Sequence, residues 1–368
     1  LVCGNVSDSP VAIDIARLLG LTLDVSDIVS LKTYSNTEFC PRFISSEQDL
    51  ENIGDGLKGA SIVIVSGNSA FYDRNSLAMR NMVLARAAKE NGAERVILVE
   101  PDLFYSAQDR GPRRVGDKEM NRSLQDLKKF DGQPFTALLY AQLLKASGVD
   151  TVLTVHNHSD KVQDLFKEVF GGDFHNLIPA DVYADYIKKS DMLECGKDGD
   201  NLVVVAPDDG ARPFMNLVFD ALNLSKAKRV IMKKVRTGER AISMSIDPES
   251  EITDLDEIEG KDLIILDDMV RTGTTIVKCC EALKEAKPNR VCFGVTHFHT
   301  SSEARENLNS SFIDEIMTTN SIPTILNRDL QGRLRRKLTV LKLGKWISRH
   351  AFDLFGIDDD RYDKDFYS

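Results

Sequence analysis

The spacing of apolar and polar residues divides the chain into alternating strands and helices. Short runs of aliphatic residues between polar flanks predict buried strands. These strands are expected at residues 61–67, 95–101, 151–157, 202–210, 229–236, 263–266 and 290–298. Apolar residues at helical spacing predict helices at 76–91, 134–147 and 276–286. Strands that alternate with helices are typical of an α/β fold with mostly parallel sheets flanked by helices.

The alternation runs through the chain twice, which predicts two domains of similar build. A chain of 368 residues is also long for a single core. We expect one domain at residues 1–149, a second at 150–325 and a final segment at 326–368. The final segment turns basic and then acidic and aromatic, and we expect it to pack back on the first domain and to carry an extension. The acidic stretch 245–260 is interpreted as a solvated connection.

Composition limits the classes of binding partner and the cellular compartment that we expect. The formal net charge of −10 argues against nucleic acid as the main partner. No apolar run approaches the ~20 residues that a membrane span needs, and no charged-then-apolar leader begins the chain. The six cysteines show neither disulfide nor zinc spacing. A reducing, cytoplasmic setting is therefore expected.

The stretch LIILDDMVRTGTTI, residues 263–276, carries the clearest chemical signal. Four aliphatic residues predict a strand, and Asp267 and Asp268 follow at its carboxyl end, where open α/β sheets bind ligands. Paired carboxylates repel a phosphate but suit sugar hydroxyls or a divalent cation. The small residues behind them predict a loop that offers backbone N–H groups and hydroxyls to a phosphate at a helix N-terminus. A phosphorylated sugar is the predicted ligand; a plain helix-capping turn is the alternative.

This stretch resembles the loop shared by type I phosphoribosyltransferases and ribose-phosphate diphosphokinases, the PRPP synthases. Further stretches, in collinear order over most of the chain, resemble the PRPP synthases. They are CGNVSD, LKTYSNTEF, VILVEPDLFYSAQDR, TVLTVHNHSDKVQ, VVVAPDDGARPF, MKKVRTGERAISM and the THFHT and TNSIP segments. APDDGARPF and KVRTGERAI are similar to the class II branch, whose members work without activating phosphate, whereas FYSAQDR is nearer to class I.

The resemblance implies transfer of diphosphate from ATP to the 1-hydroxyl of ribose 5-phosphate, releasing AMP, with Mg²⁺ as cofactor. It also implies a homo-oligomer in which a neighbouring subunit contributes site residues. The implied catalytic residues are Lys234, Arg236 and His158. The implied metal ligands are His158 and Asp208. The implied ATP-binding residues are Tyr34, Asn36, Glu38, Gln108, Asp109 and Arg110. The implied ribose 5-phosphate residues are Asp267, Asp268, Arg271, Thr272, Gly273, Thr274 and Thr275.

Three departures from the family pattern leave other functions open. Ala107 stands where the family has an arginine before Gln-Asp, and His156 opens the segment written Asp-Leu-His elsewhere. Arg271 replaces an Asp or Gln, so that it either strengthens phosphate binding or pairs with a neighbouring carboxylate. A non-catalytic regulatory paralogue and a type I phosphoribosyltransferase are the alternatives. The positions also have structural interpretations: His156 and His158 as strand-end residues or a metal pair, and Lys234 and Arg236 as a solvated strand end.

Overall fold

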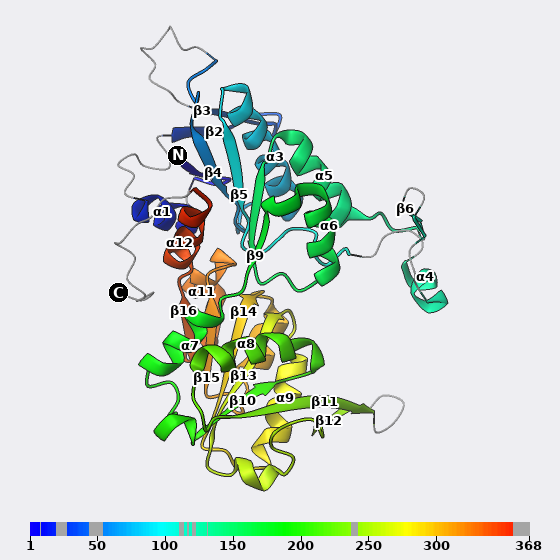
Figure 1. The fold of residues 1–368 in the computed structure, drawn as a ribbon, viewed down its shortest axis with the longest axis vertical. Helices are drawn as coiled ribbons and strands as arrows, with labels where there is room; N and C mark the ends of the chain where they lie inside the picture. The colour runs from blue at the N-terminus through cyan, green and yellow to red at the C-terminus, as the bar shows by residue number, and fades with distance from the viewer. Residues whose placement is uncertain are drawn as a thin grey trace. The chain divides into compact units, whose positions relative to one another are not determined.

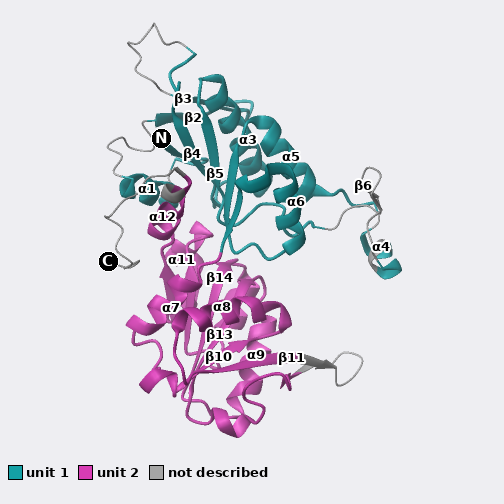
Figure 2. Ribbon diagram, in the orientation of Figure 1, with its two compact units in different colours: residues 1–177 teal, residues 178–368 magenta. Residues whose placement is uncertain are grey.

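The computed structural model describes residues 1–7, 9–19, 28–43, 54–109, 114–115, 118–119, 123–130, 132–236 and 242–355. The chain divides into two compact units, Leu1–Leu177 and Ile178–Ser368 (Figure 2). This division differs from the expected boundary at residues 149 and 150. The reason is that the strand after that point and the next one both pair with the first sheet. The part of the final segment described here, up to residue 355, belongs to the second unit.

The first unit is built on a five-stranded parallel sheet in the order β1-β4-β5-β8-β9 (Figure 1). Its strands are β1 (Val2–Gly4), β4 (Ser61–Val65), β5 (Arg95–Val99), β8 (Thr151–Val155) and β9 (Phe174–Leu177). Its helices are α1 (Pro10–Leu18), α3 (Arg74–Glu90), α4 (Leu124–Phe130), α5 (Thr136–Ser147), α6 (Asp160–Phe170) and the 3₁₀ turn η1 (Gly171–Asp173). Two short hairpins, β2 (Val29–Thr33) with β3 (Phe39–Phe43) and β6 (Arg114–Val115) with β7 (Lys118–Glu119), complete it.

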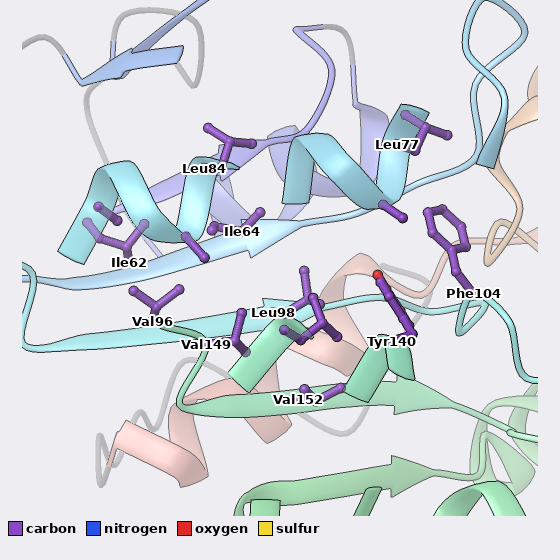
Figure 3. Close-up of a cluster of buried hydrophobic side chains, with 14 of the residues drawn as sticks. Ile62, Ile64, Leu77, Leu84, Val96, Leu98, Phe104, Tyr140, Val149 and Val152 are labelled. Carbon is purple, nitrogen blue, oxygen red and sulfur yellow. The ribbon is translucent and has the colours of Figure 1, made fainter. Parts of the chain in front are cut away.

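The central strands of this sheet are buried on both faces, as their continuous aliphatic runs predict. Alternate residues such as Ile64, Leu98 and Val152 face the core beneath α3, α5 and α6 (Figure 3). Fully burying one such side chain contributes roughly 1.5–3 kcal/mol to folding. The helices predicted at 76–91 and 134–147 are therefore confirmed as α3 and α5, shifted by two residues at most.

The second unit contains a seven-stranded sheet in the order β12-β11-β10-β13-β14-β15-β16. The β11–β12 pair is antiparallel, and the other pairs are parallel. The strands are β10 (Leu202–Ala206), β11 (Lys228–Arg236), β12 (Ile242–Ile246), β13 (Asp262–Val270), β14 (Arg290–Phe298), β15 (Glu315–Thr319) and β16 (Leu338–Leu341). Two mostly parallel sheets flanked by helices confirm the predicted fold class.

Helices cover both faces of the second sheet. They are α7 (Ala180–Lys189), α8 (Arg212–Leu222), α9 (Thr274–Lys284), α10 (Ser302–Leu308), α11 (Arg328–Gln331) and α12 (Gly344–Phe355). The 3₁₀ turns are η2 (Lys197–Gly199), η3 (Asp209–Ala211), η4 (Leu255–Ile258), η5 (Pro323–Leu326) and η6 (Gly332–Arg336). Cys279 and Cys280 are buried on α9, as their helical spacing predicts. The buried Trp346 of α12 donates its Nε1–H to Asp181 of α7 at 3.0 Å, which fastens the last helix to this unit.

None of the described helices is both long and apolar enough to cross a membrane. All six cysteines are free thiols.

Candidate active site

The strand order of the second sheet reverses between β10 and β13, and we call the carboxyl edge at this point the β10–β13 crevice. From β10 the chain moves outward through β11 and β12, and then returns to place β13 on the other side of β10. Such a reversal is the point at which open α/β sheets bind ligands, beyond the carboxyl ends of the strands. The five strands of the first sheet lie in sequential order and contain no such reversal. The topology therefore marks the β10–β13 edge as the main candidate site of the second unit.

The Asp-Asp pair lies inside β13 and not after it, which extends the strand that the sequence predicts. The pairing between β10 and β13 ends at Val205 opposite Ile265, but β13 continues along β14 through Asp267 to Val270. Asp267 shares a side of the strand with Ile265, and Asp268 shares the other with Leu266. Asp268 is only 9% exposed, and its backbone N–H donates to Asp267 Oδ1 at 2.9 Å. The sheet thus fixes both carboxylates at the crevice.

Three carboxylates interact electrostatically at this edge. Burial, followed by the charge of Asp268, raises the pKa of Asp267 well above its ordinary value. The charge of Asp208, which follows β10, raises the pKa of Asp267 further. Among the described residues, no group of three or more His, Cys, Asp or Glu side chains forms a ready-made metal cluster. The set still fits Mg²⁺, because this ion usually binds one or two carboxylates and completes its shell with substrate phosphates and water.

The backbone of the loop after β13 accepts hydrogen bonds from two side chains that follow β14. Ser301 Oγ donates to the carbonyl of Arg271 at 2.7 Å, and Asn307 Nδ2 donates to the carbonyl of Thr272 at 2.8 Å. The side chains of Arg271, Thr272 and Thr274 are exposed, and α9 begins at Thr274. Arg271 forms no ion pair within the described part of the chain. Exposed hydroxyls and the first N–H groups of an 11-residue helix suit a phosphate.

Gly273 is required where the loop meets α9. Its φ of 78° lies in the left-handed region, and a Cβ built there would approach Leu308 Cγ to 2.9 Å. Replacing Gly273 with Ala is expected to destabilise the chain by about 2 kcal/mol, because backbone strain and steric overlap add. Gly260→Ala is the matched control, since Gly260 has a φ of 71° and an added Cβ meets nothing within 4 Å. Urea denaturation of both variants checks this, and equal losses would contradict the role of the Leu308 contact.

The part of β11 that carries the predicted catalytic residues continues past the same sheet edge. The parallel pairing of β11 with β10 ends at Ile231, opposite Ala206, and β11 then continues to Arg236 paired with β12. The backbone of Lys234 and Arg236 therefore belongs to a ribbon that extends beyond the carboxyl end of β10. The side chains of both residues lie outside the described residues.

The predicted ATP-side residues occur in two places in the first unit. After β5, Asp109 accepts a hydrogen bond from Ser159 Oγ at 3.0 Å, which brings the segment after β5 next to His158. Gln108 and His158 are exposed, and Arg110 lies outside the described residues. The side chains of Tyr34, Asn36 and Glu38 are exposed at the tip of the β2–β3 hairpin. Among the described residues of this unit, Asp109 makes its hydrogen bond to Ser159 and not to a residue of this hairpin.

His156 keeps an unusual backbone at the end of β8. Its φ is 46°, and its N–H donates to the carbonyl of Leu177 at 2.8 Å. Its side chain is 7% exposed, while that of His158 is exposed. The two histidines thus lie in different environments and belong to no metal cluster of the described residues. The strand-end interpretation of His156 agrees with this position.

A buried hydrogen-bond network that sequence reasoning missed supports the ATP-side loop. The fully buried Glu100, directly after β5, accepts hydrogen bonds from Ser66 Oγ at 2.8 Å and from Asn81 Nδ2 at 2.8 Å. It also accepts from the Tyr140 hydroxyl at 2.9 Å and from the Phe104 N–H at 2.7 Å. The last bond anchors the segment that leads to Gln108 and Asp109. The only sign of this network in the sequence is one glutamate directly after the aliphatic run RVILV.

Burial is the main cause of the pKa shift of the Glu100 carboxyl group. It raises the pKa from 4.5 to about 7, even though the hydrogen bonds from Phe104, Ser66 and Tyr140 favour the charged form. The folded chain therefore binds this proton more tightly than the unfolded chain does. The associated stability is fully present below pH 4.5 and is lost as the pH rises through about 7.

We expect Glu100→Gln to remove a stability loss of about 3 kcal/mol between pH 4.5 and pH 8, because a glutamine does not ionise. The free energy of unfolding, measured in urea across this range, should fall with pH in the parent chain and stay flatter in the variant. Glu94→Gln, an exposed change at the other end of the same strand segment, is the control and should keep the parent slope. Parallel pH profiles for the parent chain and Glu100→Gln would contradict this account.

The chain is similar to known proteins in sequence and in fold. The phosphoribosyl transferase domain family matches residues 177–325, which contain the β10–β13 crevice. A ribose-phosphate pyrophosphokinase of Shewanella oneidensis is 32% identical over 283 residues, which cover 77% of each chain. Ribose-phosphate pyrophosphokinase 4 of Saccharomyces cerevisiae is 28% identical over 91% of this chain and 87% of its own.

The fold is shared with a solved structure. The crystal structure of phosphoribosylpyrophosphate synthetase from Mycobacterium smegmatis matches with a TM-score of 0.73 and 21% identity. The match covers 97% of this chain and 99% of the other, so both units take part in it. At this identity the match supports the fold, while the sequence relatives support the family. The chain belongs to the ribose-phosphate pyrophosphokinase family.

Proposed function

We propose that this protein is a ribose-phosphate pyrophosphokinase that transfers diphosphate from ATP to the 1-hydroxyl of ribose 5-phosphate. The observation that carries the proposal is the β10–β13 crevice, where Asp267 and Asp268 precede the exposed phosphate loop in a chain 32% identical to a named family member. In the reaction, the O1–Pβ bond forms and the bond from Pβ to the oxygen bridging Pα and Pβ breaks. The products are PRPP and AMP, and the 1-hydroxyl loses its proton.

The second unit would bind the sugar at both ends. Thr272, Thr274 and the first N–H groups of α9 would donate to the 5-phosphate, and exposed Arg271 would add a positive charge. Asp267 and Asp268 would accept hydrogen bonds from the 2- and 3-hydroxyls. Gripping the substrate at these two points fixes the direction of its 1-hydroxyl, and such positioning is the main requirement of phosphoryl-type transfer.

Charge neutralisation would come from Lys234, Arg236 and His158, and from Mg²⁺ held by Asp208. The two basic residues of β11 would stabilise negative charge that develops on the transferred group. His158 would donate to a phosphate oxygen, because Mg²⁺ prefers oxygen ligands to nitrogen. Asp208 would hold Mg²⁺, and Asp267 and Asp268 would add negative charge that attracts the ion; bound Mg²⁺ would lower the repulsion between the triphosphate and the attacking oxygen.

The first unit would bind ATP through Gln108, Asp109 and Arg110, and a neighbouring subunit would contribute Tyr34, Asn36 and Glu38. Tyr34 supports this assignment because it is 46% exposed at the tip of a hairpin whose base is packed against the core. An exposed aromatic ring suits stacking on adenine. We therefore propose a homo-oligomer, and the free thiols support a cytoplasmic location.

Incubation with ATP, ribose 5-phosphate and Mg²⁺, with and without inorganic phosphate, tests the function. Formation of AMP and PRPP in equal amounts is the expected result, and its dependence on phosphate would assign the chain to one branch of the family. A folded protein that binds ATP but forms no AMP under either condition would contradict the proposal. That outcome would favour the non-catalytic paralogue. It would also indicate that the departures at Ala107, His156 and Arg271 have removed catalytic activity.

A further inference from the structure

A cavity in unit 2 lies apart from the β10–β13 crevice. It has a volume of about 840 Å³ and opens between the segment Asn309–Ile313 and the segment Arg328–Lys337. The first segment leads into β15 at Glu315, and the second leads into β16 at Leu338. The cavity therefore lies where the chain enters these parallel strands, whereas the Asp-Asp pair and the phosphate loop lie where β13 ends. We call it the basic pocket.

Positive charge dominates the basic pocket. It is lined by five basic residues and one acidic residue, namely Arg328, Arg333, Arg335, Arg336, Lys337 and Asp329. The chain as a whole has a formal net charge of −10, so this concentration runs against the average. Like charges gathered in one cavity repel one another, and an anion bound among them would relieve that repulsion.

The arginines of the basic pocket lack the partners that other arginines of this unit have. Arg229 pairs with Glu251, and Arg290 pairs with Glu315. Within the described residues, none of the four pocket arginines forms an ion pair, and their side chains are exposed. Their guanidinium groups are therefore available to a ligand.

Lys337 joins the two walls of the pocket. Its Nζ donates to the carbonyl of Ser310 at 2.8 Å and to the carbonyl of Ile313 at 3.0 Å. Partial burial lowers the pKa of Lys337, although the charge of Asp314 opposes this shift. These bonds hold the arginine-bearing segment against the 309–313 segment. Ser310 and Ser311 add hydroxyl groups to the lining.

We propose that the basic pocket is a binding site for a small oligophosphate, either free or as the phosphate chain of a nucleotide. Guanidinium groups bind phosphate oxygens through paired hydrogen bonds and stay charged at every physiological pH. The cavity volume lies within the range of small-molecule sites. No aromatic side chain belongs to the described lining, so the site recognises phosphate groups and offers no stacking surface to a base. The proposal does not depend on the proposed catalytic activity.

Calorimetric titration of the full chain with inorganic triphosphate, in metal-free buffer of low ionic strength, tests the proposal. The triple variant Arg333→Ala, Arg335→Ala, Arg336→Ala is expected to lose one equivalent of binding, or to bind it at least about tenfold more weakly. Added salt should weaken the same equivalent in the parent chain. The matched control removes three exposed positive charges elsewhere in the unit, Lys197, Lys226 and Lys228, and should bind as the parent does.

Further ligands separate the possible sources of the phosphate. Inorganic phosphate, inorganic triphosphate and ATP are each titrated into the parent, the arginine variant and the control. If the arginine variant binds one equivalent less of both triphosphate and ATP than the parent does, the site recognises the phosphate chain, as proposed. Equal binding by all three proteins would overturn the proposal, as would equal losses in the two triple variants. A single-stranded RNA that binds the pocket more tightly than triphosphate would overturn it in favour of a nucleic-acid surface.

Discussion

Replacing Lys234 with Ala is expected to lower kcat by about 10³-fold, with a much smaller change in the KM values. A cation that stabilises charge mainly in the transition state contributes to kcat, and removing such a group typically costs 10²–10⁵-fold. Lys234 belongs to the part of β11 that extends past the end of β10, on the side of the sheet where the crevice lies. Steady-state rates of AMP formation measure the effect.

Lys233→Ala is the matched control for this prediction. The neighbouring lysine is half-buried, and its Nζ lies 3.9 Å from Asp247 Oδ2, so it has a structural partner of its own. Because successive side chains of a strand alternate between faces, the spacing K-x-R assigns Lys234 and Arg236 to one face and Lys233 to the other. Lys233→Ala should keep kcat within about threefold of the parent value, since exposed ion pairs contribute little. Equal losses in the two variants would contradict a specific role for Lys234.

Replacing Asp267 with Asn should change stability and activity in opposite directions. Burial and the charges of Asp268 and Asp208 raise the pKa of Asp267, so its proton contributes stability at low pH that is lost as the pH rises through the folded-state pKa. The neutral amide avoids this loss, and the variant should unfold at a higher temperature than the parent at pH 8. Its kcat/KM for ribose 5-phosphate should nevertheless fall by at least about 100-fold, because the amide loses an acceptor and the charge that attracts Mg²⁺.

Thermal unfolding and steady-state kinetics on the same protein preparations measure both effects. Asp209→Asn provides the control, because Asp209 is exposed at the same sheet edge and pairs with Arg212 at 3.1 Å. The control should leave kcat/KM nearly unchanged and should not raise the unfolding temperature. A variant at Asp267 that is less stable than the parent at pH 8 would contradict the electrostatic account of the crevice. A variant that keeps full activity would remove Asp267 from the proposed site.

The β13 side of the crevice could be predicted from the sequence because its signal is local. LIILDD followed by RTGTT places strand, carboxylates and loop within 14 consecutive residues, and the structure keeps them in that order. The exact end of the strand could not be predicted. Asp267 to Val270 remain in β13 because β14 is long enough to pair with them, and pairing partners far apart in sequence leave no local mark.

The features that sequence reasoning missed depend on contacts between distant segments. The boundary was expected near residue 150 because the pattern restarts there, but β8 pairs with β5 and so remains in the first unit. The Glu100 network joins Ser66, Asn81 and Tyr140, which are separated by many residues. Only the fold could show that these side chains meet. The basic segment near residue 330 was noted from its composition, but its convergence on one cavity depends on Lys337 holding two walls together.

Following the phosphorus atoms of ATP tests the central claim most directly. ATP labelled with ³³P at the α-position and ³²P at the β-position is incubated with ribose 5-phosphate, Mg²⁺ and the full chain, and the products are separated by chromatography. The account predicts that all ³²P released from ATP appears in the sugar product and all ³³P in AMP, since the oxygen of the 1-hydroxyl attacks Pβ. Labelled ADP carrying both isotopes, or no transfer by a folded protein that binds both substrates, would contradict it.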